Sequence, residues 1–428
     1  MLEENKPMNG ALNQQVGFSK SESPARKILV EEYNDFGALA SMQQEWDDFV
    51  ELVSGDIFLT YGWCRIWWKY YGDRRKLQIF VFRSNSEIVG IIPLFFEKLW
   101  LGPVFVKAVK IVGSDFTIAQ FSLPIHNKYI KAVIQKFFEL LSSEHNWDII
   151  HIGPIAGSYE HYNDLKNAYE GSFGHSHLVL NENKGVQTYF KLADTWDEYL
   201  AGLNRKERTK IKRHYRLACK AAGDKTASVV AKCATMDNFE EMFAGFVQMH
   251  QEHWQRLNKL GHFGDWYCGH EFHRELAEAQ LKRKRLRLIQ IGLGDRCLGY
   301  KYGYIFGDNY FDFLDARSDC NELANVGLGR IVYSEMIKKA IREKAKWIDS
   351  MRGEYKHKLE MGGQLFPTRN LYVIPKKTVT VVRVRLFRLF AWLLNFFYYR
   401  VWYHKVAPKL PLRRRALWNT WIRTCGFA

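Results

Sequence analysis

Two glycines in front of a helical pattern are the first residues in this sequence whose type and spacing suggest chemistry. They are Gly327 and Gly329, in the stretch Val-Gly-Leu-Gly-Arg at 326–330. Glycine is a poor helix former, so two glycines in a first helical turn need a reason. Backbone N–H groups at a helix N-terminus, with no side chain in the way, form an anion site that suits a pyrophosphate. The alternative is a tight loop that leads into the helix and binds nothing.

The residues from Leu328 onward predict a helix, because the apolar residues among them recur with a period near 3.6. These apolar residues are Leu328, Ile331, Val332, Met336, Ile337, Ala340 and Ile341. Arg330 stands one residue inside the helix, where its guanidinium can add a charge-assisted hydrogen bond to a phosphate. Val326, Gly327, Gly329 and Arg330 therefore make up the predicted anion-binding loop.

Strand patterns surround this helix in an order that the first half of the chain repeats. In the second half, aromatic and β-branched residues predict strands at 286–293, 297–306, 310–316 and 347–351. In the first half, strand patterns at 76–83, 87–96 and 147–153 surround a helical pattern at 128–143. In both halves a tryptophan precedes a glycine by six residues, Trp147 before Gly153 and Trp347 before Gly353. This order favours an internal duplication.

The two copies differ at the glycine loop, since the first has Ser122-Leu123-Pro124 in its place. We therefore expect only the second copy to bind an anionic ligand.

The net charge of +16 is concentrated at the end of the chain. No Asp or Glu follows Glu360, whereas 13 Lys and Arg do, and the first 360 residues hold 49 basic and 46 acidic residues. The charge is therefore no sign of a DNA-binding body. Seven scattered cysteines without a Cys-x-x-Cys pair favour a reducing compartment. Residues 1–26 have no apolar run, so we expect a mobile N-terminus and no signal peptide.

The meander, glycine loop, helix and strand resemble the core of GNAT acyltransferases, in particular the CelD-like branch, which is related to tandem-GNAT FemAB-type transferases. Five stretches carry the resemblance: Phe58 to Trp63, Ile91 to Leu94, Leu203 to Arg208, Met249 to Trp254, and Gly353 to Lys356. The sequence departs from the family where Ile348-Asp349-Ser350-Met351-Arg352-Gly353 replaces the usual Asp-Phe-Leu-x-Gly.

The resemblance implies an α+β fold of tandem GNAT-like mixed sheets flanked by helices. We expect a GNAT-like domain at 27–190 with a degenerate donor site, a GNAT acyltransferase domain at 191–377, and a basic amphipathic tail at 378–428. The donor that it implies is acetyl-CoA or another acyl-CoA, bound at the glycine loop.

Candidate catalytic residues lie outside this loop. A general base must remove the acceptor's proton near neutral pH, and the imidazole of His253 suits that task. By resemblance, Tyr355 occupies the place of the acid that protonates the leaving thiolate, and Lys356 is a substrate or donor contact. Asp315, at the end of a strand, is a candidate for orienting the acceptor. Each of these residues has a structural alternative, such as packing, a surface loop or a turn cap.

A basic run begins at Asn204 on a predicted helix. Arg205, Lys206 and Arg208 are candidates for binding substrate, and the alternative is an ordinary solvated face. The pairs His250 with His253 and His270 with His273 complete no recognised ligand set, so we expect no metal.

The tail combines an apolar face with arginines. The apolar run from Leu389 to Tyr399, interrupted by Asn395, is too short to span a bilayer. Its aromatics and clustered arginines favour a helix lying on an anionic membrane surface. The alternative is an accessory helix docked on the catalytic body.

The sequence therefore predicts a cytoplasmic acyltransferase, peripheral on the inner face of the membrane. The resemblance implies N- or O-acyl transfer to a small molecule or glycan precursor in cell-envelope or exopolysaccharide biosynthesis. Two alternatives stay open at this stage. One is a Fem-like transferase that uses aminoacyl-tRNA, and the other is a non-catalytic scaffold of a polysaccharide synthesis complex.

Overall fold

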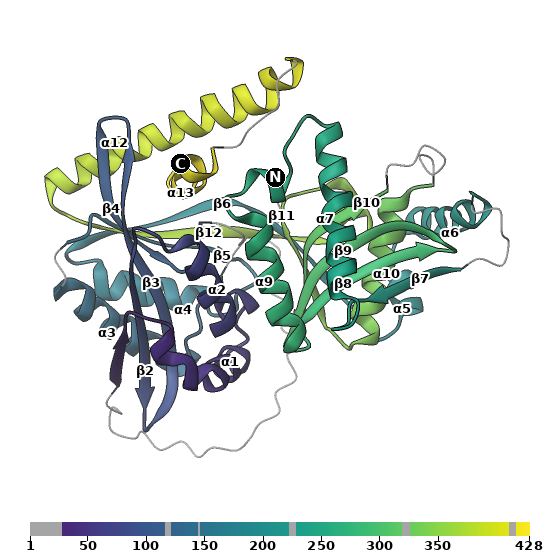
Figure 1. Cartoon of the computed structure of the whole chain (residues 1–428). Helices are drawn as coiled ribbons and strands as arrows, with labels where there is room; N and C mark the ends of the chain where they lie inside the picture. Colours follow the sequence, from purple (N-terminus) through teal and green to yellow (C-terminus); the bar gives the residue numbers. More distant parts are fainter. Residues whose placement is uncertain (1–27, 116–120, 144–145, 222–227, 319–325, 411–416) are drawn as a thin grey trace.

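The computed structural model describes residues 28–115, 121–143, 146–221, 228–318, 326–410 and 417–428. The predicted mobile segment 1–26 lies outside these residues. The described strands form one mixed sheet of twelve, in the order β1-β2-β3-β4-β5-β12-β6-β11-β10-β9-β8-β7. Helices flank this sheet (Figure 1). The α+β class and the mixed sheet flanked by helices expected from the sequence are confirmed.

The strands divide between two halves of the chain. Those of the first half are β1 (Leu29–Tyr33), β2 (Lys76–Ser84), β3 (Glu87–Leu101), β4 (Val104–Ile111), β5 (Ile149–Ala156) and β6 (His177–Lys191). Those of the second half are β7 (Val229–Cys233), β8 (Leu286–Leu293), β9 (Arg296–Phe306), β10 (Asn309–Arg317), β11 (Trp347–Arg352) and β12 (Gln364–Pro375).

The helices follow the same division, with a group at the end of the chain. The first half has α1 (Gln43–Leu52), α2 (Tyr61–Tyr71), α3 (Ile130–Ser143) and α4 (Tyr162–Phe173). The second half has α5 (Trp196–Gly202), α6 (Arg205–Ala221), α7 (Phe239–Arg256), α8 (His262–Asp265), α9 (Gly269–Lys282), α10 (Leu328–Arg342) and α11 (Lys356–Glu360). The last segment has α12 (Thr378–Leu394), the helical turns η5 (Asn395–Val406) and α13 (Arg423–Cys425).

Each half has the same parallel crossover. In the first half β4 leads through α3 to β5, and residues 108–110 pair in parallel with 149–151. In the second half β10 leads through α10 to β11, and residues 309–311 pair in parallel with 347–349. Gly153 and Gly353 follow these pairings with positive φ angles of 139° and 113°. The shared element order and the shared tryptophan-to-glycine spacing thus correspond to one repeated arrangement.

Two long strands join the halves. β12 belongs to the second half in sequence, yet it lies between β5 and β6 and pairs antiparallel with both. β6 pairs through residues 187–191 with β11. The predicted boundary at residue 190 therefore falls at the end of β6, in the middle of a continuous sheet.

Both faces of the second half are covered. Leu286 and Leu288 of β8 join the core cluster that contains Phe243 and Phe246 of α7. Ile289 and Ile291 of the same strand join another cluster, which contains the inner face of α10. Side chains two positions apart share a face of a strand, so α7 and α10 lie on opposite faces of the sheet.

α12 packs over β4 of the first half and over β12, which lies between the first-half strands β5 and β6. Val384, Phe387 and Ala391 are buried in a core cluster with Tyr372 and Phe427, near the end of the chain. Two ion pairs anchor the helix: Arg383 with Asp148 at 3.0 Å, and Arg388 with Glu182 at 2.7 Å. None of the described helices is long and apolar enough to cross a bilayer. One face of the predicted tail helix is thus part of the folded body.

Candidate functional site

The predicted anion-binding loop leads directly into α10. Gly327 is the N-cap residue, with φ +73° and ψ +41°, a left-handed conformation that favours glycine. A Cβ atom at Gly327 would lie 2.4 Å from the ring of His214, on α6, so this side chain also requires a glycine here. The cap has no side chain that accepts from the first N–H groups. Within the described part of the chain, the first turn of α10 therefore presents backbone N–H groups without a capping side chain.

Gly329 has more room than Gly327. Among the described residues, a Cβ atom there would meet the guanidinium of Arg317, at 3.7 Å. Val326 is buried in the core beneath the loop, so its contribution to a ligand would come from its backbone. The preceding residues 319–325 lie outside the described part of the chain.

Arg330 is engaged by carboxylates. Its guanidinium bonds to Glu207 of α6 at 2.8 Å and also to Glu360 of α11. Lys210 bonds to Glu207 at 2.6 Å and pairs with Glu360 at 3.5 Å, so two cations share two carboxylates. Charge at the start of α10 is thus balanced, and the network ties α6, α10 and α11 together.

Beside this helix end, β10 and β11 separate. Their parallel pairing ends at Phe311 and Asp349. Beyond that point β10 has a bulge between Asp312 and Leu314, and the pairing of β11 with β6 has an irregularity between Asp349 and Arg352. We call the place where these two strands diverge the fork.

A buried polar network forms the floor of the fork. Lys301 of β9 lies 3.0 Å from a carboxylate oxygen of Asp312, whose other oxygen accepts from the Ser350 hydroxyl at 3.1 Å. The hydroxyl of Tyr333, from α10, lies 2.5 Å from that of Ser350. Lys358 donates to the carbonyl of Ser350, and burial lowers the pKa of Lys358. Because these buried polar groups all have hydrogen-bond partners, the network holds the diverging strands in place against α10.

Asp315 lies on the arm of β10 beyond the bulge, with its side chain open to solvent. Crowding by protein atoms disfavours the charged form of Asp315, but attraction to the positive charge of Lys301 outweighs it, so the pKa of Asp315 is lowered. Its backbone carbonyl accepts from Nδ1 of His250, at 2.8 Å. The structure therefore holds an ionised carboxylate at the edge of the fork.

His253, the predicted base, lies near the end of α7 and is partly exposed. Its ring meets that of Trp254 edge-on, with the ring centroids 5.8 Å apart. The buried histidine one turn earlier, His250, is the one that bonds to the backbone of Asp315. Burial lowers the pKa of His250, so this ring is neutral near pH 7.

Tyr355 caps α11 just beyond the arm of β11, and its side chain is 54% exposed. Its ring lies 5.8 Å from that of His357, and Nζ of Lys358 lies 5.0 Å from the Tyr355 ring centroid. Lys356 is exposed. Asp315 thus lies on the β10 arm of the fork, and Tyr355 lies just beyond the β11 arm.

The first half contributes a carboxylate that the sequence analysis missed. Asp56 precedes the turn Ile57–Leu59, and the ring of Phe58 in this turn lies 5.4 Å from that of Phe311 on β10. One oxygen of Asp56 accepts from the backbone N–H of Ser122 at 2.5 Å. Burial, reinforced by the charge of Asp349, raises the pKa of Asp56 to about 7. Asp56 is therefore poised between its protonated and ionised forms near neutral pH.

The predicted substrate-binding residues on α6 have different surroundings. Arg208 donates to the carbonyls of Ala201 and Leu203, at 2.9 and 2.7 Å, and so closes the end of α5. Arg205 and Lys206 are exposed at the start of α6. Of the three predicted residues, Arg205 and Lys206 are therefore the two whose charged groups face solvent.

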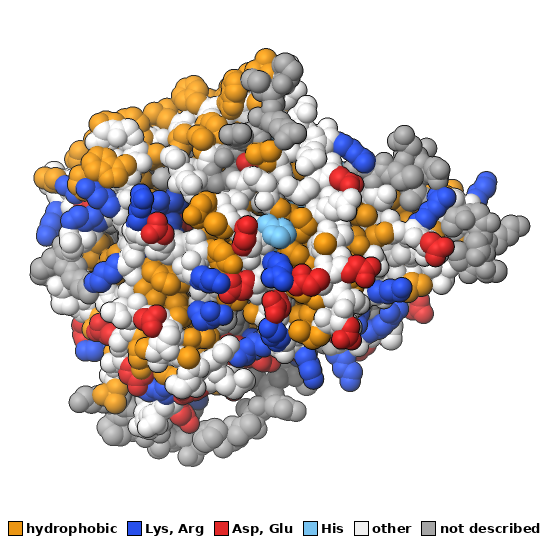
Figure 2. Space-filling view, viewed as in Figure 1, with side chains coloured by type: hydrophobic (Ala, Val, Ile, Leu, Met, Phe, Trp, Pro, Cys, Tyr) orange, Lys and Arg blue, Asp and Glu red, His pale blue; other side chains and the backbone are white. Residues whose placement is uncertain are grey.

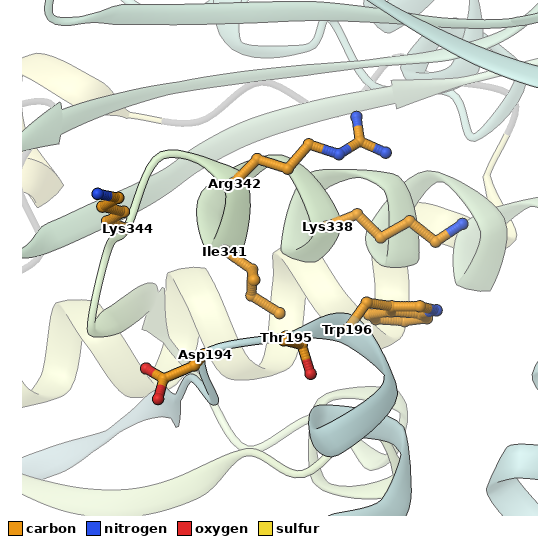
Figure 3. A pocket seen from close by; sticks show the side chains of 7 residues that line it. All are labelled: Asp194, Thr195, Trp196, Lys338, Ile341, Arg342 and Lys344. Atoms are coloured by element: carbon orange, nitrogen blue, oxygen red, sulfur yellow. The ribbon is translucent and has the colours of Figure 1, made fainter.

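Other parts of the described chain offer less chemistry. Its His, Cys, Asp and Glu side chains form no group of three or more that is suited to a metal ion. A hollow of about 490 Å³ lies at the opposite end of α10 from Gly327, between Ile341 and Trp196. Figure 3 shows Ile341 pointing toward Thr195, while Lys338 and Arg342 extend along the helix. This hollow is remote from the fork.

Comparison with known protein families finds a match in the second half of the chain. Residues 205–359 match the family profile of an acetyltransferase (GNAT) domain. This segment runs from α6 to α11 and contains the glycine loop and the fork. The match is to this segment, and the fold of the chain as a whole is GNAT-like in tandem. No curated protein matches the chain in sequence.

Solved structures extend the likeness to both halves. FemX is 12% identical, with a TM-score of 0.55 over 82% of this chain and 100% of FemX. A protein of unknown function from Bacteroides thetaiotaomicron is 13% identical, with a TM-score of 0.48 over 78% and 97% of the two chains. L-PGS from Bacillus licheniformis is 10% identical, with a TM-score of 0.47 over 81% and 96%. At this identity, the likeness to FemX concerns the fold alone.

Proposed function

We propose that this protein is an acyltransferase that moves an acyl group from acyl-CoA, such as acetyl-CoA, to an amine or hydroxyl acceptor. The observation that supports this proposal is the fork between β10 and β11, which opens beside the uncapped N-terminus of α10 within the GNAT-matching segment. The helix end suits the donor's pyrophosphate, and the fork gives the donor's acyl end access to the sheet.

The donor site in this proposal relies on backbone groups. The N–H groups at the start of α10, beside Gly327 and Gly329, hold the phosphates, and Val326 supports the loop from below. Arg330 serves mainly to fix α6 over the helix end, because its charge is compensated by Glu207 and Glu360. Arg317 lies close to Gly329, with a guanidinium nitrogen 3.7 Å from where a Cβ atom would lie, and it is a second cation beside the proposed phosphate site.

The chemistry requires one base and one acid. The acceptor's nitrogen or oxygen attacks the acyl carbonyl and loses a proton to the base, and the departing thiolate takes a proton from the acid. Tyr355 is the proposed acid, and Asp315 orients the acceptor. Two groups are candidates for the base: His253, from the sequence, and Asp56, from the structure. We favour Asp56 because a backbone hydrogen bond fixes it and its pKa lies at about 7.

The pathway and location are part of the same proposal. The CelD-like resemblance supports a role in cell-envelope or exopolysaccharide synthesis at the cytoplasmic side of the membrane, with a small-molecule or glycan-precursor acceptor. The exposed Arg205 and Lys206, with Lys356, then serve as outer contacts for an anionic donor or acceptor. Under the alternative of an aminoacyl-tRNA donor, the same cations would meet RNA phosphates.

The decisive experiment compares two substitutions at Gly329 that differ only in charge. Gly329→Glu places a carboxylate beside the proposed phosphate site, whereas Gly329→Gln has the same shape without charge. Acetyl-CoA affinity, measured by calorimetry, should be lower for the Glu variant than for the Gln variant by at least about tenfold, or ~1.4 kcal/mol. Equal affinities of the two variants would show that acetyl-CoA does not bind at this helix end.

A donor panel separates the alternatives. Thiol release from acetyl-CoA, with amine and hydroxyl acceptors, supports the proposed reaction. Product formed only with aminoacyl-tRNA supports the Fem-like alternative. Absence of turnover with either donor, from folded protein, supports the scaffold alternative.

A further inference from the structure

α12 has two apolar faces, and the protein covers only one of them. Val384, Phe387 and Ala391 face the sheet. On the opposite side lies a stripe that we call the outer apolar face. It consists of Val379, Val382, Leu386, Leu389, Trp392 and Phe396, all exposed. Intervals of three and four residues place most of these side chains along one line of the helix. In Figure 2, hydrophobic side chains line the upper edge of the molecule, where Figure 1 draws α12.

The tip of the β3–β4 hairpin extends this face. A Cβ atom at Gly102, in the turn, would lie 3.8 Å from the ring of Phe390 on α12, so the tip lies against the helix. Trp100, just before the turn, is 56% exposed. An apolar groove of about 430 Å³ runs between Pro103 and Val104 on one side and Val379 and Val382 on the other. The exposed apolar surface therefore continues from one element to the next.

The side-chain charges around the outer apolar face that are not ion-paired within α12's contacts are positive. The hairpin segment 98–111 has no Asp or Glu, and none follows Glu360. Two acids that do meet α12, Asp148 and Glu182, are paired with Arg383 and Arg388.

Cations remain exposed at the rim of the face. Lys376, Lys377 and Arg385 are exposed on or next to α12. Nζ of Lys98 lies 4.6 Å from the ring centroid of Trp100, at the hairpin. An occupant of this face must therefore be apolar at its centre and negative at its edge.

We infer that the outer apolar face docks on an anionic lipid bilayer, with α12 lying in the plane of the interface. A large apolar patch on a protein surface marks an interaction site. A helix with an apolar stripe, tryptophan and basic flanks has the composition of interfacial membrane helices. The lipid headgroups supply the negative charge that the rim cations lack, and the acyl chains cover Leu386, Leu389 and Trp392. The arginines that point inward hold the helix on the body, so the whole protein is positioned by this contact.

The test is co-sedimentation of the full chain with vesicles of phosphatidylcholine, with and without phosphatidylglycerol. Binding should require the anionic lipid, and should weaken when salt rises from about 0.1 M to about 1 M, which shortens the screening length from about 10 Å to about 3 Å. The double substitution Leu386→Gln with Leu389→Gln should weaken binding by at least about tenfold, because two leucines lose their apolar burial. Gln keeps helix propensity, so α12 should remain folded.

A matched control lies on the other side of the molecule. Leu52, at the end of α1, is 73% exposed and Leu389 is 51% exposed, so Leu52→Gln removes an apolar side chain that is at least as accessible. This control should bind vesicles like the unmodified protein.

Three results would overturn the inference. The first is a full-length protein that ignores anionic vesicles at low salt. The second is equal vesicle binding by the double variant and the Leu52→Gln control. The third is self-association that the double variant abolishes, measured by light scattering, because the face would then be an interface between copies. None of these measurements depends on acyl transfer, so a failure of membrane docking would leave the proposed acyl-transfer reaction untouched.

Discussion

The Nδ1 atom of His250 lies 2.8 Å from the backbone carbonyl oxygen of Asp315, and this contact determines how the histidines of α7 are used. A carbonyl only accepts, so Nδ1 carries the proton. Nε2 of the neutral ring then accepts from Nδ1 of His262, also at 2.8 Å. His250 is thereby committed to holding the arm of β10 that presents the Asp315 carboxylate, and His253 remains the histidine of this helix with access to solvent.

The base can be assigned by two substitutions. We expect Asp56→Asn to lower the turnover number by about a hundredfold or more, the usual effect of removing a positioned base, and His253→Ala to lower it by less than about tenfold. Steady-state kinetics with acetyl-CoA measures both, and Michaelis constants should change little. The reverse pattern would assign the base to His253, as the sequence alone suggested.

Asp56 should also affect how the free energy of unfolding depends on pH, and this effect can be measured without an activity assay. The pKa of its carboxyl is raised to about 7 in the folded protein, compared with about 3.9 in an unfolded chain. Stability from this group is therefore present below the unfolded pKa and is lost as pH rises through about 7. Asp56→Asn removes the titration while keeping an acceptor for the N–H of Ser122.

The gain in unfolding free energy from Asp56→Asn should consequently be larger at pH 8 than at pH 5. Urea unfolding at the two pH values measures it. A stability change that is the same at both values would show that Asp56 does not titrate in this range.

The structure explains why the sequence indicated one part of the site and missed another. The glycine loop and α10 are local: a period of 3.6 and two glycines within three residues predict a helix start, and α10 begins at Leu328. The fork floor is not local. Lys301, Asp312 and Ser350 come from three strands, and each looks like an ordinary strand residue until the sheet brings them together.

The same distinction applies to the fold. The strands of the meander were predicted within about two residues, because alternation and turns are short-range signals. β6 and β12 were missed, since their register comes from pairing with each other across nearly two hundred residues of chain. Asp56 was missed for the same reason: its pKa depends on Ser122 and Asp349, which are distant in sequence.

Tyr355 is the proposed acid, and its substitution by Phe removes only the hydroxyl. We expect the turnover number of Tyr355→Phe to fall by about a hundredfold or more, with little change in acetyl-CoA affinity, because the acid acts in the chemical step. Acceptors that are easier to acylate should not rescue it, since protonation of the thiolate is common to all of them. Turnover equal to that of the unmodified protein would leave Tyr355 as a surface residue that caps α11.

Substitutions on the inner face of α12 test whether this helix is part of the folded body or a tail that can detach from it. Phe387 is buried against Phe427 and the sheet, so Phe387→Ala should lower the free energy of unfolding by about 3–5 kcal/mol. Its neighbour Leu386 faces solvent, and Leu386→Ala should change stability by no more than about 0.5 kcal/mol. Urea unfolding of the full chain compares the two variants on one helix, with the same type of substitution. If both leave stability unchanged, α12 is not part of the core, and membrane docking through its outer face would not position the catalytic body.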